Sequence, residues 1–173
     1  MTINELVLDC FGRIREAVTD LLDGLTPGQL DYQPQPGSNT IAWLVWHLTR
    51  IQDDHVAAAA AGIEQVWLAD GWCERFGLPL ERLDQGYGHT AEQVAVVRAS
   101  PELLGGYHEA VFEQTARFVA GLGETDLDRI VDRRWDPPVT LGVRLVSVIA
   151  DDLQHAGQAA YLRGLSERLS SSS

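Results

Sequence analysis

The chain has 173 residues, of which 45% are hydrophobic and 22% are charged, so it is neither a disordered nor a fibrous protein. All 13 basic residues are arginines, and with 25 acidic residues they give a formal net charge of −12. An acidic surface of this strength repels a phosphate backbone, and Arg133 and Arg134 form the only adjacent basic pair. We therefore expect no nucleic-acid partner.

The N-terminal residues predict neither secretion nor insertion into a membrane. Asn4, Glu5 and Asp9 interrupt the apolar positions, unlike the basic start and the apolar core of a signal peptide. No apolar run approaches the roughly 20 residues of a membrane span. These features predict a cytoplasmic protein without a membrane partner.

The length and the two cysteines predict one domain without disulfides. A chain of this size buries one core, which we place over residues 1–169, followed by a mobile serine tail at 170–173. Cys10 and Cys73 stand outside any CxxC motif, so we expect two reduced thiols.

Two long helices are predicted in the first 61 residues. Apolar side chains recur every three or four positions from Ile3, and this pattern ends near Gly24. The stretch Thr26–Thr40 is interrupted by prolines and glycines and is expected to be an irregular connection. A second amphipathic pattern predicts a helix over Ile41–Ala61.

The second half of the chain predicts two further long helices. Over Gly62–Thr90 the apolar residues no longer recur at helical spacing, which predicts an irregular crossover containing at most one short helix. Another short helix is expected over Ala91–Ala99. The third long helix begins at Pro101 and ends near Gly121. A rigid loop at Trp135–Pro138 precedes the fourth, over Thr140–Leu169.

Four long helices without a convincing strand signal predict an all-α four-helix bundle. The crossover between the second and third long helices is nearly thirty residues long, which is enough for the chain to return along the bundle. These two helices are therefore expected to run parallel, and the bundle to follow an up-down-down-up path.

Three side chains on two of these helices could hold a divalent metal. Asp151 and His155 are four residues apart, so they lie on one helix face about 6 Å apart along the axis. His47, within the apolar stripe of the second long helix, is the natural third ligand. His55 is excluded because eight helical residues separate it from His47 by about 12 Å.

Spacing alone leaves a second interpretation open. A carboxylate and an imidazole at this spacing form a plain hydrogen-bonded pair more often than a metal clamp. If they do bind a metal, two histidines and one carboxylate leave coordination positions open for water or substrate, as in a catalytic centre.

Two segments carry a resemblance to a known family. Residues 41–48 (IAWLVWHL) and 151–158 (DDLQHAGQ) resemble the two motif regions of the DinB-like superfamily of metal-binding four-helix bundles. Within it, the chain looks closest to actinobacterial members related to mycothiol-dependent S-transferases and maleylpyruvate isomerase. His47 and His155 match family ligand positions, whereas Asp151 stands where the family usually has histidine.

The resemblance implies a divalent metal that activates a low-molecular-weight, mycothiol-like thiol for attack on a small electrophile. It makes Zn²⁺ or Ni²⁺ the first expectation, while the carboxylate of Asp151 shifts the preference toward harder ions such as Fe²⁺ or Mn²⁺. The alternative is a stress-related bundle that binds a metal or a small ligand without turnover. A homodimer is also expected, although the sequence names no interface.

Trp43, Trp46 and Tyr161 are candidate walls of a substrate pocket, although aromatic residues at helical spacing are often core residues. Arg50, and Arg163 as another choice, are candidates for binding an acidic or sugar-containing thiol near the mouth of that pocket, unless they are solvated charges.

Other features are assigned more ordinary roles. Residues 86–89 (GYGH) form either a lid over the metal or an ordinary turn. Asp54 could orient a ligand but is expected to be solvated, and His108, beside Glu109, is expected to face solvent.

Overall fold

The structure is a computed structural model that describes residues 1–170, without the side chains of Ala59, Glu124 and Ser170. Its long helices are α1 (Ile3–Leu22), α3 (Ile41–Gln52) with its π-helical continuation η1 (Asp53–Ala61), α7 (Pro101–Ala120) and α8 (Leu141–Ser170). The all-α expectation is confirmed. Of the serine tail predicted to be mobile, residues 171–173 lie outside the described residues, and Ser170 is the last residue of α8.

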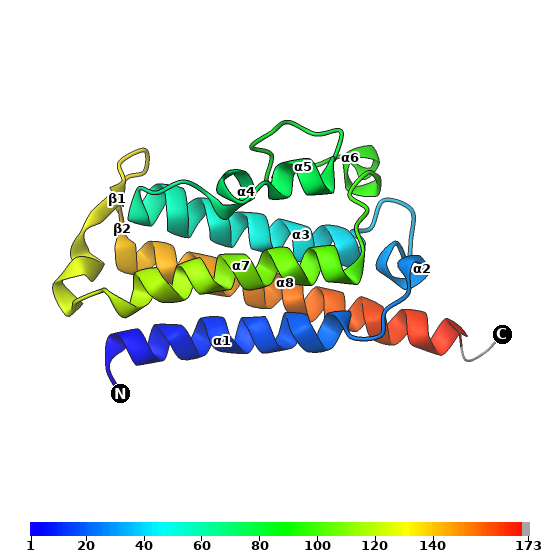
Figure 1. Ribbon diagram of the computed structural model, residues 1–173, viewed down its shortest axis with the longest axis horizontal. Coiled ribbons are helices and arrows are strands. Elements are labelled where there is room, and N and C mark those ends of the chain that lie inside the picture. Colours follow the sequence, from blue (N-terminus) through cyan, green and yellow to red (C-terminus); the bar gives the residue numbers. More distant parts are fainter. Residues whose placement is uncertain (171–173) are drawn as a thin grey trace.

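The four long helices lie side by side, with α1 and α8 running in one direction and α3 and α7 in the other (Figure 1). The most extensive helix packing is that of α3 against α8 and of α1 against α7. Within residues 1–170, no helix combines the length and the apolar character that a membrane crossing requires.

Short elements fill the connections between the long helices. The connection after α1 contains α2 (Pro27–Leu30), and the crossover contains two short helices where at most one was expected, α4 (Val66–Ala69) and α5 (Trp72–Phe76). The predicted short helix before α7 is present as α6 (Ala91–Ala95). In Figure 1 the crossover lies beside α3.

A small hairpin precedes α8, where the sequence predicted only a rigid loop. After the 3-10 turn η2 (Glu124–Asp128), strand β1 (Ile130–Asp132) pairs antiparallel with β2 (Val139–Thr140). Asp132 holds the hairpin because its buried carboxylate accepts hydrogen bonds from Arg134 and, at 2.9 Å, from Arg144 of α8. This anchoring depends on charged side chains of the hairpin loop and of the first turn of α8, which is why the apolar pattern did not reveal the strands.

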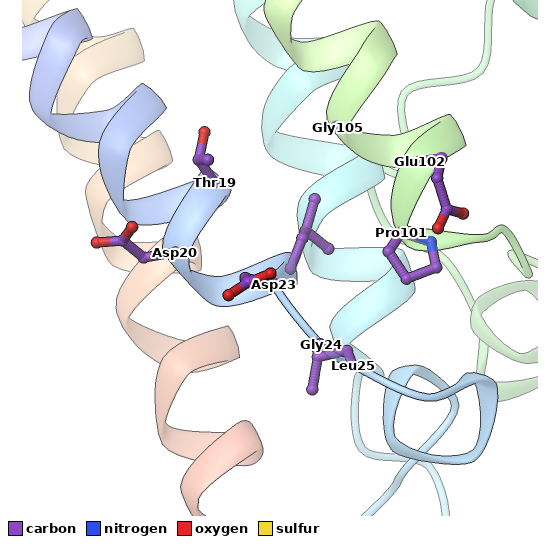
Figure 2. A pocket seen from close by; sticks show the side chains of 9 residues that line it. Thr19, Asp20, Asp23, Gly24, Leu25, Pro101, Glu102 and Gly105 are labelled. Atoms are coloured by element: carbon purple, nitrogen blue, oxygen red, sulfur yellow. The ribbon is translucent and has the colours of Figure 1, made fainter.

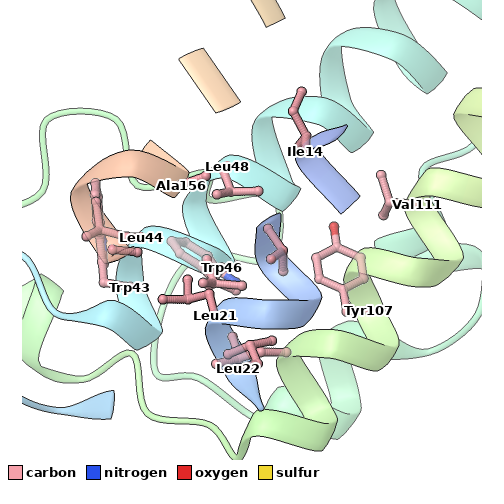
Figure 3. Close-up of a cluster of buried hydrophobic side chains, with 14 of the residues drawn as sticks. Ile14, Leu21, Leu22, Trp43, Leu44, Trp46, Leu48, Tyr107, Val111 and Ala156 are labelled. Carbon is pink, nitrogen blue, oxygen red and sulfur yellow. The ribbon is translucent and has the colours of Figure 1, made fainter. Parts of the chain in front are cut away.

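The core lies between the four long helices, and Figure 3 shows side chains from all of them meeting there. All twelve residues of α3 are buried, so this helix has no solvent-facing side. Thr40 caps α3 by accepting a hydrogen bond from the Trp43 amide at 3.0 Å, which sets the residue at which the helix begins. The polar side chains of α3 are therefore cut off from water and depend on partners inside the protein, although the indole N–H of Trp46 has none among the described residues.

His108 is buried, with 2% of its surface exposed, and the expectation that it faces solvent is wrong. It lies on the buried stripe of α7, four residues after Leu104 and three before Val111. This helical spacing places His108 in the core even though the adjacent Glu109 is charged. The Thr49 hydroxyl donates to the Val45 carbonyl at 2.7 Å, so it accepts from Nδ1–H of His108 at 3.1 Å. His108 is therefore neutral, and burial lowers its pKa to about 4.

This buried histidine should make the protein less stable in mild acid. Between the folded pKa of about 4 and the unfolded value of 6.5, the unfolded chain binds a proton that the folded protein does not. The free energy of unfolding should therefore fall as the pH drops through this window. The two pKa values correspond to a loss of about 3 kcal/mol.

His108→Leu should remove this component without leaving an unpaired group, because Thr49 still donates to Val45. Denaturant titrations of both proteins from neutral pH to about pH 4 measure the effect as the change in their stability difference, in which the carboxyl groups common to both cancel. A stability difference that stays constant with pH would show that His108 is not buried in its neutral form.

Candidate metal centre

The structure brings His47, Asp151 and His155 together between α3 and α8. One potential ligand atom from each residue lies within 4.8 Å of the other two. The two imidazole rings have centroids 4.8 Å apart, and Nε2 of His155 is 3.6 Å from Oδ1 of Asp151. Nitrogen or oxygen atoms bound to one tetrahedral Zn²⁺ lie about 3.4 Å apart. The most widely separated ligand atoms, up to 4.8 Å apart, would thus need to approach by about 1.4 Å to share such an ion.

The hydrogen bonds of the two histidines leave matching nitrogens free. Nδ1–H of His47 donates to the backbone carbonyl of Gln85, and Nδ1–H of His155 donates to the side-chain oxygen of Gln158 at 3.0 Å. Each neutral ring then has a lone pair on Nε2. Carbonyl groups behind ligand imidazoles fix ring orientation in this way in metalloproteins.

The carboxylate of Asp151 completes a set of acceptors. Its Oδ2 atom is buried and has no hydrogen-bond partner among the described residues. Two imidazole lone pairs and a carboxylate therefore converge without a donor that joins them. This arrangement fits a cation, either a metal ion or a proton shared by His155 and Asp151.

Electrostatics favour neutral imidazole at His47. Burial lowers its pKa most strongly, and His155 adds to this effect, while Asp151 opposes it. A neutral imidazole is the form that binds a metal.

Asp152, next to Asp151, lies in a different environment and was missed as a site-adjacent residue. It is fully buried, and burial together with the charge of Asp151 raises its pKa well above the usual range. A raised pKa favours the uncharged form of Asp152, which suits a carboxyl group whose two oxygens are buried without a hydrogen-bond partner among the described residues. Its position four residues after Val148 and four before Ala156 places it on the buried stripe of α8, a signal already present in the sequence.

The crossover loop packs against the aromatic side of the site. Gly86 adopts a positive φ of +89°, and a Cβ atom added there would lie 2.9 Å from Nδ1 of His47 and 3.0 Å from both Trp43 and Trp46. Only glycine allows so close an approach. The loop places the Gln85 carbonyl on His47 and covers the two indole rings.

Two side chains hold this loop in place. Asp84 accepts hydrogen bonds from the Gly86 amide at 2.7 Å and from Nε2–H of His89 at 2.9 Å. Nδ1 of His89 accepts from the indole N–H of Trp43 at 3.0 Å. Because an indole N–H only donates, His89 must be neutral and protonated on Nε2.

The two tryptophans proposed as pocket walls lie at different distances from the candidate metal centre: Trp43 contacts His47, and Trp46 lies behind the loop. Trp43 stacks on His47 with ring centroids 4.5 Å apart and lies almost perpendicular to the His155 ring, with centroids 6.2 Å apart, so it forms a wall of the site. Trp46 stacks on His89 instead and is 1% exposed, which places it behind the loop.

Arg50 lies in a buried network and not at the mouth expected for a thiol-binding arginine. Its side chain is fully buried, donates to Asp84 O at 3.1 Å and to Gln65 at 2.8 Å, and is 3.5 Å from Asp53. Tyr107 donates to Asp53 at 2.8 Å and accepts from Arg50. These distant partners hold Arg50 inside the protein, where it supports the loop that contacts His47.

Asp53 and Asp54 also have partners inside the protein. Asp53 is 1% exposed and accepts from the first two backbone amides of α4, those of Val66 and Trp67, at 2.9 and 2.8 Å. Asp54 accepts a hydrogen bond from the side-chain amide of Gln65 at 2.7 Å and is only half-buried. Together they attach the start of η1 to the crossover.

Tyr161 lies on the solvent side of the site. It is 67% exposed and lines a groove of about 410 Å³ that also includes Ser38, Asn39 and Gln158. Because Gln158 accepts from His155, this groove adjoins the candidate metal centre. Arg163 is not in the groove and donates to the carbonyls of Asp20 and Leu21 at the end of α1.

A larger cavity of about 570 Å³ lies elsewhere, between the end of α1 and the start of α7 (Figure 2). Asp20, Asp23 and Glu102 line it, and none of the three candidate ligands does. This cavity is therefore separate from the candidate metal centre.

Comparison with known proteins identifies the family. None of the curated proteins matches the chain. Among solved structures, a conserved protein of Enterococcus faecalis is 33% identical, with a TM-score of 0.86 over 94% of this chain and 96% of that one. The mycothiol S-transferase family matches residues 6–167, nearly the whole sequence. The chain therefore belongs to the mycothiol S-transferase family.

Proposed function

We propose that the chain is a cytoplasmic, divalent-metal-dependent thiol S-transferase or isomerase built on an up-down-down-up four-helix bundle. Its metal ligands are His47, Asp151 and His155. The observation that carries the proposal is the convergence of two imidazole lone pairs and a carboxylate with a buried, unpartnered oxygen. Family membership supports a thiol as the cosubstrate.

A divalent metal, when bound, would supply the positive charge that keeps a coordinated thiol in its thiolate form. The residues of the chain supply the surroundings. The carbonyls of Gln85 and Gln158 orient the imidazoles, and Trp43 excludes water from one side of His47. Zn²⁺ and Ni²⁺ suit such a donor set best, and Fe²⁺ and Mn²⁺ also accept it.

The groove beside Gln158 is the proposed site for the rest of the thiol or for the electrophile. Ser38, Asn39, Gln158 and Tyr161 offer hydroxyl and amide groups, and none of them is charged. These groups suit a substrate part that carries hydroxyl or amide groups. The buried Arg50 supports the loop, so we assign it a positioning role.

A second candidate function is a bundle that binds a metal or a small ligand without turnover. The burial of His47, 6% exposed, favours it because a substrate would have limited access to that ligand. The two functions differ in turnover alone, so metal binding does not separate them.

Removal of a ligand should remove the metal. Protein purified without chelator should hold about one divalent ion per chain by elemental analysis, whereas His155→Ala should hold almost none. Its helix content by circular dichroism should stay close to that of the wild type, because His155 lies at the edge of the core. Gln154→Ala, exposed on the same helix turn, is the matched control and should retain the metal. Equal metal content in His155→Ala and wild type would reject this ligand set.

Gly86→Ala should disturb the site through His47. The added methyl meets three side chains at 2.9–3.0 Å and should cost about 1–3 kcal/mol of stability beyond the backbone strain. It should also weaken metal binding by about 10–100-fold, as loss of an orienting hydrogen bond does. The matched control is Gly88→Ala, with a φ of +73° but nothing within 4 Å of the added methyl. If both variants bind metal equally well, the loop does not orient His47.

Turnover should require both the metal and a thiol. Metal-loaded protein, mixed with mycothiol and a panel of small electrophiles, should consume the thiol faster than buffer does, and His155→Ala should not. Mass spectrometry of the products identifies the new carbon–sulfur bond or, for an isomerase, the rearranged substrate. Metal binding without thiol consumption across the panel would instead establish the non-catalytic function.

A further inference from the structure

The outward face of α8 is an uncharged surface. All ten exposed residues from Val143 to Tyr161 lack charge. Along this face runs a row that we call the outer strip, consisting of Val143, Val146, Ala150, Leu153, Gly157 and Ala160, which recur every three or four residues. Its larger side chains are well exposed, with 55% for Val143, 68% for Val146 and 47% for Leu153.

The other helices show how unusual this face is for the protein. On α1, six of the nine exposed residues are charged, and on α7 the exposed residues include Glu102, Glu113 and Arg117. A long exposed apolar strip on a protein surface marks an interaction surface.

The lack of charge on the outer strip also favours contact between two copies of the chain. At a net charge of −12, two copies repel each other, and this repulsion is weakest where the contact itself adds no charge.

The outer strip is complementary to a second, antiparallel copy of itself. If a two-fold axis passes close to Leu153, then Val146 faces Ala160 of the other copy, and Ala150 faces its Gly157. Val143 faces Gly164 of the other copy, which lies one helical turn beyond the end of the outer strip. The larger side chains thus meet smaller ones on both sides of the axis, and the small residues let the two helices approach closely.

The strip is large enough for a reversible dimer. From Val143 to Ala160 it is about 27 Å long, and half of a helix circumference is about 16 Å, which gives about 430 Å² on each copy. The pair would bury about 860 Å², the size of a weak, reversible interface. We propose that two copies of this chain associate through their outer strips, with α8 of one antiparallel to α8 of the other.

Sedimentation velocity across the micromolar range tests this dimer. The wild type should shift from 19.0 kDa toward twice that mass as its concentration rises. Leu153→Glu places two like charges at the axis and should raise the dissociation constant at least about 100-fold. The matched control is Leu6→Glu, on the charged face of α1, because Leu6 is 46% exposed, close to the 47% of Leu153. This variant should behave as the wild type does.

Salt and cross-linking test the kind of contact. Added salt should tighten the dimer, because screening reduces the repulsion between two acidic copies while the apolar contact remains. In a background of Cys10→Ser and Cys73→Ser, Leu153→Cys should oxidise to a covalent dimer, and Val143→Cys should cross-link efficiently only when mixed with Gly164→Cys. A wild type that stays at 19.0 kDa, equal effects of Leu6→Glu and Leu153→Glu, or failure of both cross-links would overturn the proposal.

Discussion

The burial of His47 is the constraint on which the candidate site depends. Because every residue of α3 is buried, this imidazole cannot be solvated, and both of its nitrogens need partners inside the protein or on a ligand. The Gln85 carbonyl satisfies Nδ1. The packing of α3 on α8 then places a second imidazole and a carboxylate near Nε2. None of these groups offers a hydrogen-bond donor to the others, so a bound cation would satisfy all three acceptors at once.

The crossover is therefore part of the site and not only a connection. Its carbonyl groups accept from buried donors, with Asp84 O bound to Arg50 and Arg82 O bound to the Trp67 indole at 2.8 Å. These contacts set the position of the Gln85 peptide, and through it the orientation of His47. Arg50 thus acts on the site from a distance by holding the backbone, a role that a long loop with few regular elements makes necessary.

The sequence predicted the long helices well because their spacing and caps are local properties. It also named the three side chains that converge, since the i, i+4 spacing of Asp151 and His155 sets their relation before any folding. What it could not predict depends on partners far apart in the chain. The burial of Arg50 follows from Gln65 and Tyr107, contributed by the crossover and by α7. For His108 a local signal was present, and its charged neighbour was given too much weight.

The two adjacent aspartates show how α8 sets the charge of the site. Asp152 is fully buried, and burial raises its pKa well above the usual range, whereas the carboxyl group of Asp151 is partly exposed and lies beside the two imidazoles. A divalent ion held by these residues would leave a net charge of about +1, and a thiolate would then bring the region to neutrality. Neutrality matters here because uncompensated charge is costly in a buried place. A third histidine in place of Asp151 would leave excess positive charge with the same thiolate, so the carboxylate matches the site to a singly charged ligand.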